Sequence, residues 1–417
     1  MSRNRIYLCL AHMSEAGLEQ KYIKEAFDTN WVVPLGPNVN GFEKDLEEFC
    51  GQNKRVVALS AGTAAVHLGL LACGVGPGDE VCVQSFTFCA SSHPITYLGA
   101  TPVFIDSEKD TWNMDPDLLE EAIKDRIANT GKKPKAIVPV ALYGMPYRID
   151  RIMEIANKYD IPVVEDAAEG FGSRFNGQVL GTFGKYGVLS FNGNKMITTS
   201  GGGALITENE DEWREIMMCA TQYRESYPYY QHEKIGYNYR MSNICAGIGR
   251  GQMTVVNDHI AHHKHVQKLY EELLKDVKGV TVHSQPATGE YDSNYWLCTI
   301  TLDPDLRIKG QENAYKTIVK GAVGGAAGVI HVADSATTDC QPNNNVEALR
   351  VFMDQSGIEA RPVWKPMHKQ PVYKNAPAYV NGVSEAVFKI GMCLPAGPYV
   401  KDDDVKYIVE TIKSAIK

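Results

Sequence analysis

Residues 55–74 read RVVALSAGTAAVHLGLLACG, an apolar run joined to a helical pattern through a short loop that contains a glycine. The run over 55–60 predicts a buried strand, because strands covered on both faces are nearly continuous in apolar residues. Residues 63–74 have the alanine and leucine content of a helix. A strand that leads directly into a helix is the repeating unit of a parallel sheet. The stretch therefore predicts an α/β fold.

The same alternation continues toward the C-terminus. Further strands are expected at residues 80–85, 101–106, 135–142, 161–166 and 187–194, and helices at 87–99, 115–128 and 147–160. Asp115 stands at the expected start of one helix, where a carboxylate accepts hydrogen bonds from free backbone N–H groups. Apolar strands separated by helices indicate a mostly parallel sheet covered on both faces.

The pattern changes in the C-terminal part of the chain. A long helix is expected over 252–277, followed by weaker strands at 280–284, 295–303 and 359–364 and by helices at 344–357 and 405–417. We therefore expect a large α/β domain over 1–255 and a small α+β domain over 256–417. The segment GAVGGAAGVI has too many glycines for a good helix and too few β-branched residues for a strand, so no element is predicted there.

Composition limits the classes of partner and compartment. Lysine and arginine together number 42, and aspartate and glutamate 50, which gives a net charge of −8. No dense basic run is present, which argues against DNA or RNA as the main partner. The ten cysteines form no CxxC pair, so no metal site is predicted and a reducing compartment is indicated. Because neither a signal-peptide core nor a membrane-length apolar run is present, we expect a soluble cytoplasmic protein.

Four loops that follow predicted strands contain candidate binding residues. Gly62 and Thr63, Phe88, Asp166 and Lys195 each come after the end of an apolar run. Because ligands bind beyond the carboxyl ends of parallel strands, we expect these positions to converge. Each has a plainer alternative: a helix cap for Gly62 and Thr63, core packing for Phe88, a turn cap for Asp166, and a phosphate contact or surface position for Lys195.

Together these positions favour pyridoxal 5′-phosphate (PLP) as the cofactor. PLP chemistry needs a lysine that bonds to the cofactor, a carboxylate against the pyridine nitrogen and a phosphate cradle. Lys195, Asp166 and the Gly62–Thr63 helix start supply these three parts. Glu165 points to the opposite face of its strand and is expected to be structural.

Several motifs carry a resemblance to a known family. They are SAGTAA (60–65), SFTFCAS (85–91), VVEDAAEGFGS (163–173), SFNGNKMITTSGGG (190–203) and GYNYRMSN (236–243). In these stretches, and over nearly the whole chain, the sequence resembles the PLP-dependent sugar-nucleotide aminotransferases of the DegT/DnrJ/EryC1/StrS family. The resemblance implies the aspartate-aminotransferase (type I) fold and a homodimer with shared active sites.

The resemblance also implies roles for residues around the cofactor. Lys195 matches the lysine that bonds to PLP and then moves a proton between the amino carbon and C4′. Asp166 matches the carboxylate that keeps the pyridine nitrogen protonated, and Phe88 the aromatic residue stacked on the ring. Glu169 stands where many members have glutamine near the ring hydroxyl, so its contribution stays open. The role of Asn194, next to the lysine, is also left open.

Further residues are matched to the phosphate and the substrate. Gly62, Thr63 and Ser190 match phosphate ligands from one subunit, and Asn238 matches a ligand that reaches in from the partner chain. The stretches that similar proteins place around the nucleotide sugar contain Asn30, Trp31, Arg361 and His368. For His368, a surface histidine with satisfied hydrogen bonds is an equally simple interpretation.

The resemblance implies a transaminase that uses L-glutamate as donor. The stretches TNWVVPLGPNV (29–39), SNYW (293–296) and EARPVWKPMH (359–368) are most similar to 4-aminotransferases acting on UDP-4-keto-6-deoxy-N-acetylglucosamine in the UDP-N-acetylbacillosamine pathway. We therefore expect an enzyme of bacterial surface polysaccharide or glycan biosynthesis. Alternatives are a GDP-4-keto-6-deoxymannose 4-aminotransferase of the perosamine type, a 3-keto sugar aminotransferase, and a regulatory protein without turnover. The unmatched stretch GAVGGAAGVIHVADSATTDC leaves the sugar open.

Overall fold

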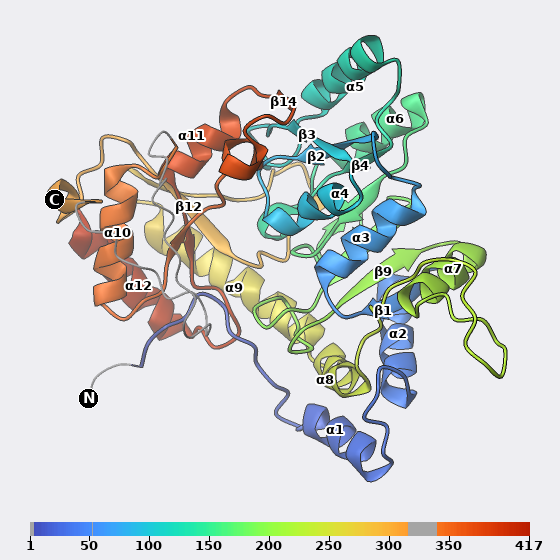
Figure 1. Ribbon diagram of the computed structural model, residues 1–417. Coiled ribbons are helices and arrows are strands. Elements are labelled where there is room, and N and C mark those ends of the chain that lie inside the picture. Colours follow the sequence, from blue (N-terminus) through green and yellow to red (C-terminus); the bar gives the residue numbers. More distant parts are fainter. Residues whose placement is uncertain (1–3, 52, 316–339) are drawn as a thin grey trace.

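The computed structural model describes residues 4–51, 53–315 and 340–417 (Figure 1). The glycine-rich stretch GAVGGAAGVI (321–330), for which no element is predicted, lies outside these residues. Within them, no helix has both the length and the apolar character needed to cross a membrane.

Two four-stranded ladders form one wide sheet. The first has the order β1-β9-β8-β5 and the second the order β14-β3-β2-β4. Isolated parallel bridges from Ile137 to Val163 and from Val140 to Asp166 connect β4 to β5. These strands are β1 (Arg55–Leu59), β2 (Glu80–Gln84), β3 (Thr101–Ile105), β4 (Ala136–Val138), β5 (Val164–Asp166), β8 (Tyr186–Ser190), β9 (Gly203–Thr207) and β14 (Ala378–Tyr379).

The pairing confirms the predicted mostly parallel sheet. Neighbouring strands in this sheet run parallel, except that β9 lies antiparallel between β1 and β8. The pattern of the sequence does not predict β9 or the edge strand β14. Because β1, β2, β5 and β8 run in one direction, their carboxyl ends lie along the same edge of the sheet.

Helices cover both faces of this sheet. Alternate residues of β1 point to opposite sides, so that Val57 and Leu59 belong to one apolar cluster and Val56 and Ala58 to the other. The first cluster includes residues of α3 (Gly62–Ala72), α4 (His93–Tyr97) and α7 (Glu210–Ala220). The second includes residues of α2 (Pro37–Cys50), α5 (Pro116–Thr130), α6 (Ile149–Tyr159), α8 (Asn243–Met253) and α9 (Val256–Leu274). The expected three-layer α/β arrangement is present.

A second sheet lies on the other side of α9 (Figure 1). Its order is β10-β12-β15-β13, and all its pairs are antiparallel. The strands are β10 (Val280–Val282), β12 (Cys298–Leu302), β13 (Arg361–Pro362) and β15 (Gly391–Leu394). A third apolar cluster joins this sheet to α9, α10 (Asn344–Gln355) and α12 (Asp402–Ala415). The division into domains at residue 255 stays a prediction.

The remaining elements connect these parts. They are α1 (Leu18–Asp28), α11 (Val383–Ile390) and a small sheet of β6 (Arg174–Phe175), β7 (Gln178–Val179) and β11 (Tyr291–Asp292). The helix predicted over 252–277 is in fact two helices, because α8 ends at Met253 and α9 begins at Val256. The helix predicted over 87–99 is reduced to a short 3₁₀ turn over Cys89–Ser91 and to α4.

Candidate active site

A cavity of about 330 Å³ lies at the carboxyl ends of the parallel strands. The sequence-predicted residues that line it are Gly62, Thr63, Phe88, Asp166, Glu169, Ser190, Asn194 and Lys195. They come from loops widely separated in the chain, and the direction of the strands brings them together. The expected convergence of the strand-end residues is therefore present in the structure.

One end of the cavity presents free backbone N–H groups. Helix α3 begins at Gly62, and no side chain caps its N-terminus. A Cβ atom placed on Gly62 would lie 2.9 Å from the Cβ atom of Ser190, so only glycine allows the helix start to approach this serine so closely. Free N–H groups, the positive end of the helix dipole and two nearby hydroxyl side chains, those of Thr63 and Ser190, together suit a phosphate.

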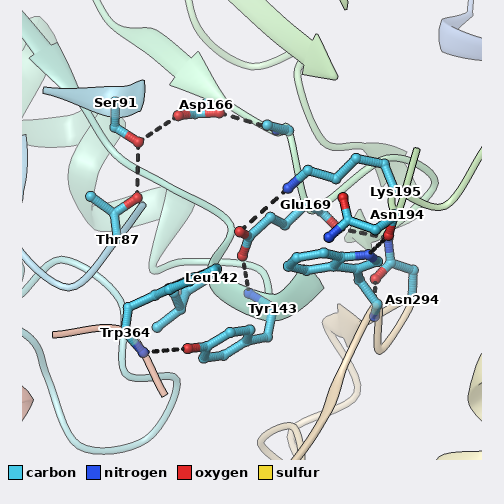
Figure 2. A network of polar contacts seen from close by, with 12 residues as sticks. Thr87, Ser91, Leu142, Tyr143, Asp166, Glu169, Asn194, Lys195, Asn294 and Trp364 are labelled. Carbon is cyan, nitrogen blue, oxygen red and sulfur yellow. Dashed lines mark hydrogen bonds and ion pairs between the residues drawn. The ribbon is translucent and has the colours of Figure 1, made fainter. Parts of the chain in front are cut away.

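A buried carboxylate occupies the middle of the cavity. Asp166 ends β5, and its Oδ2 accepts a hydrogen bond of 2.6 Å from the hydroxyl of Ser91, which is in turn 2.8 Å from the Thr87 hydroxyl (Figure 2). The backbone N–H of Ala168 donates to Oδ1 at 3.1 Å. Burial raises the pKa of Asp166, while the hydrogen bond from Ser91 opposes this. The two hydrogen bonds thus fix the orientation of the Asp166 carboxylate, and its buried charge favours a cationic partner.

Lys195 lies on a closed loop after β8. The loop is pinned at its base, because the N–H of Thr199 donates to the carbonyl of Phe191 at 2.9 Å. The Nζ atom of Lys195 is 3.5 Å from Oε1 of Glu169 (Figure 2) and 4.0 Å from the centre of the Trp296 ring. The sequence near Lys195 offers no acidic neighbour, and the fold supplies one from the loop after β5.

Glu169 is held by the backbone on its other side. Its Oε2 accepts a hydrogen bond of 2.7 Å from the N–H of Tyr143, whose phenol oxygen accepts one of 2.7 Å from the N–H of Trp364 (Figure 2). Burial raises the pKa of Glu169, and the charge of Lys195 opposes this. The carboxylate therefore belongs to a network that reaches from the lysine to the segment after β13.

Aromatic side chains form a wall of the cavity. Phe88 is 49% exposed, so it does not pack in the core, and its ring centre is 5.4 Å from that of Trp364. Trp296 and Trp364 both line the cavity, and sequence reasoning did not single them out. They stand in the quoted stretches SNYW and EARPVWKPMH, but neither follows a strand of the parallel sheet. The strand-end argument could not find them.

Five predicted residues, here called the outer residues, do not line this cavity. They are Asn30, Trp31, Asn238, Arg361 and His368. Asn238 lines a neighbouring hollow that shares Ser60 and Gly201 with the cavity. The Nδ1 atom of His368 is 2.6 Å from the Ser85 hydroxyl, and burial lowers the pKa of this histidine. Arg361 pairs with Glu359 at 2.7 Å.

Comparisons with known proteins agree with this site. The DegT/DnrJ/EryC1/StrS aminotransferase family matches residues 14–314 and 311–413. The chain belongs to this family. A member from Bacillus subtilis (strain 168), EpsN, whose description as a PLP-dependent aminotransferase is itself provisional, is 41% identical over 98% of this chain and 95% of its own.

Two further members extend the comparison. The GDP-perosamine synthase of Caulobacter vibrioides is 33% identical over 96% of both chains. The crystal structure of a family member from Brucella abortus superposes with a TM-score of 0.80 at 27% identity, covering 96% of this chain and 95% of that one. The chain therefore has the type I aminotransferase fold and is a PLP-dependent sugar aminotransferase.

The cavity fits the cofactor of this family. A phosphate fits at the uncapped start of α3, where Gly62 allows the Ser190 side chain to lie close to the free N–H groups. A protonated ring nitrogen would satisfy the buried charge of Asp166. Lys195 offers an amine to which the cofactor aldehyde would bond. Apart from Asn238, the residues that the sequence analysis assigned to the phosphate, the ring nitrogen and the covalent bond thus lie in one cavity.

Proposed function

We propose that this enzyme moves an amino group from L-glutamate to C4 of a UDP-linked 4-keto-6-deoxy-N-acetylhexosamine, in the cytoplasm, for bacterial surface polysaccharide or glycan biosynthesis. Support for the reaction comes from one observation: Lys195, Asp166 and the uncapped helix start of Gly62 line a single cavity. Support for the sugar comes from the resemblance of residues 29–39, 293–296 and 359–368 to 4-aminotransferases of the bacillosamine branch.

PLP, when bound, supplies the electron sink that stabilises a carbanion on the amino carbon. Asp166 holds the ring nitrogen protonated through its negative charge, and the Ser91 hydroxyl keeps its carboxylate aimed. Lys195 would take a proton from the amino carbon and return it at C4′ of the cofactor, acting as base and then as acid. Phe88, whose ring lies 5.4 Å from that of Trp364, would cover the cofactor ring, and the two aromatic side chains would shield the reacting atoms from water.

The active site extends to the outer residues in this proposal. Asn238 contributes to the phosphate site of a partner subunit in a homodimer, and Asn30 and Trp31 contact the nucleotide sugar. The exposure of Trp31, 39% in the single chain, supports a role at a surface that a partner covers. Arg361, on β13 of the second sheet, and His368, which contacts Ser85 directly after β2, also contact the nucleotide sugar in this proposal.

A GDP-linked 4-keto-6-deoxymannose is the second candidate substrate. The identity of 33% to the Caulobacter GDP-perosamine synthase over nearly the full length of both chains favours it. The chemistry at C4 is the same for both sugars, so the choice depends on contacts to the base and to the 2-substituent.

A substrate comparison tests the proposal. The enzyme, loaded with PLP, is incubated with L-glutamate and either UDP-4-keto-6-deoxy-N-acetylglucosamine or GDP-4-keto-6-deoxymannose. The expected result is 2-oxoglutarate formation with the UDP sugar and a product whose mass corresponds to a 4-amino sugar nucleotide. Faster turnover of the GDP sugar would replace the first candidate by the second, and no 2-oxoglutarate with either would reject both.

A further inference from the structure

The amine of Lys195 lies between two groups that attract positive charge. Glu169 Oε1 is 3.5 Å from Nζ, and the centre of the Trp296 ring is 4.0 Å from it. The lysine side chain is 13% exposed and that of Glu169 is 4% exposed, so little water competes. A carboxylate and an indole face both stabilise an ammonium group, more strongly where water is scarce. We call Glu169 and Trp296 the ammonium seat.

The backbone orients the carboxylate half of the seat. The N–H of Tyr143 binds Oε2 of Glu169 at 2.7 Å, which leaves Oε1 toward the lysine. Tyr143 has a φ of 53°, in the left-handed region that bulky residues rarely adopt. Such a conformation persists only where surrounding contacts enforce it, and here it aims a donor at the active-site carboxylate.

One buried side chain ties the two halves together. Asn294 donates from Nδ2 to the carbonyl oxygen of Glu169 at 3.0 Å and accepts at Oδ1 from the N–H of Trp296 at 2.8 Å. The indole N–H of Trp296 donates to the carbonyl of Asn194, the residue before the lysine, at 2.6 Å. The seat and the lysine loop are therefore linked by direct hydrogen bonds.

We propose that Glu169 and Trp296 are positioning residues that stabilise the free, charged amine of Lys195 when it is not bonded to the cofactor. When PLP binds covalently, the ammonium group releases a proton, its nitrogen replaces the aldehyde oxygen, and that oxygen leaves as water. The seat then loses its ammonium. Pyridoxamine 5′-phosphate has no aldehyde, so the lysine stays free and the seat stays occupied. The seat therefore weakens PLP binding relative to pyridoxamine phosphate binding.

Equilibrium dialysis of both cofactors against the apoprotein tests this proposal. The quantity is the ratio of the Kd for PLP to the Kd for pyridoxamine phosphate. Glu169→Gln keeps the shape and the acceptor for Tyr143 but removes the charge, and we expect the ratio to fall about tenfold. In Trp296→Leu we expect a fall of about threefold, and in Trp296→Phe, which keeps a ring face, a smaller one. A purely structural role would weaken the binding of both cofactors together and leave the ratio unchanged.

A second tryptophan provides a matched control. Trp213 also carries a cation, since the Arg55 guanidinium carbon is 4.4 Å from its ring centre, and its indole N–H donates to the Val56 carbonyl at 3.0 Å. It does not line the cavity, so Trp213→Leu should leave the ratio unchanged. A ratio in Glu169→Gln that equals or exceeds the wild-type value overturns the proposal, even if Trp296→Leu does not fold. No sugar is present in the assay, so this outcome is separate from the substrate proposal.

Discussion

The residues at the cofactor end of the cavity and the outer residues were all predicted from the sequence, but in the single chain only the first group lines the cavity. Gly62, Asp166 and Lys195 line one cavity, whereas Asn238 and His368 lie outside it. The first group follows parallel strands, whose direction alone brings their ends together. The second group does not follow strands of the parallel sheet, so the direction of those strands does not bring these residues together. The residues that line the cavity therefore form a site within one chain, whereas we propose that the outer residues act with a partner subunit or with the substrate.

Lys195→Ala gives the largest expected effect at the cofactor end. Loss of the amine removes both the covalent attachment and the proton transfer, so we expect a fall in transamination of at least about a thousandfold. The visible absorbance band of the bound cofactor should disappear. Pyridoxamine phosphate should still bind, which shows that the cavity is intact. Turnover at the wild-type rate would remove Lys195 from the mechanism.

Asp166→Asn tests the charge at the same end. The amide can still accept the hydrogen bond from Ser91, but the negative charge is lost, and we expect the glutamate half-reaction to slow about a hundredfold. Because burial raises the pKa of Asp166, protonation in acid occurs at a higher pH than for an ordinary aspartate. Because a cationic ring nitrogen would lower this pKa, the raised value applies to the apoprotein. The PLP affinity of the wild-type apoprotein should therefore fall as the pH decreases through this pKa, and the variant should lack that limb. If Asp166→Asn shows the same decrease in acid as the wild-type protein, a titrating group other than Asp166 causes that decrease.

Mixing subunits tests the assignment of Asn238 to the partner chain. Asn238→Ala alone should weaken PLP binding about tenfold, through the loss of one phosphate contact. If the site is shared, equal amounts of Asn238→Ala and Lys195→Ala subunits re-form intact sites in mixed dimers, about a quarter of all sites. Activity measured after dissociation and reassociation should rise accordingly at limiting PLP. Activity equal to the average of the two separate variants would place Asn238 within its own chain's site.

The smallest effect on activity is expected at Glu165, the neighbour of Asp166 on the opposite face. It is fully buried, accepts from the N–H of Phe183 at 3.0 Å, and burial raises its pKa to about 6. The folded protein thus binds this proton more tightly than the unfolded chain, so its stability declines as the pH rises through about 6. Glu165→Gln should raise the free energy of unfolding at pH 7.5 by about 1 kcal/mol and leave PLP affinity unchanged. Calorimetry measures the free energy of unfolding, and equilibrium dialysis measures the PLP affinity. A weaker PLP affinity in Glu165→Gln would contradict the expectation that only the Asp166 side of β5 serves the cofactor.

The sequence predicted the strand-end residues because the end of a continuous apolar run marks where a buried strand stops. It could not predict Trp296, which precedes β12 in the second sheet and reaches Lys195 only through tertiary packing. Ser91 was missed for a similar reason, since it lies on a short turn after Phe88 and contacts a carboxylate 75 positions away. The break between α8 and α9 could not be predicted either, because neither Thr254 nor Val255 is a proline or a glycine.

Strand β14 has a consequence for attempts to shorten this protein. Its two residues, Ala378 and Tyr379, run beside Phe104 and Ile105 of β3, and the N–H of Asp106 donates to the Tyr379 carbonyl at 3.0 Å. A fragment that stops at residue 255 would lack this strand, and β3 would present unpaired N–H and C=O groups at an open edge. Open edges of that kind recruit other chains. Truncation there would therefore yield an aggregating fragment, and a soluble one would need the 378–379 segment grafted back beside β3.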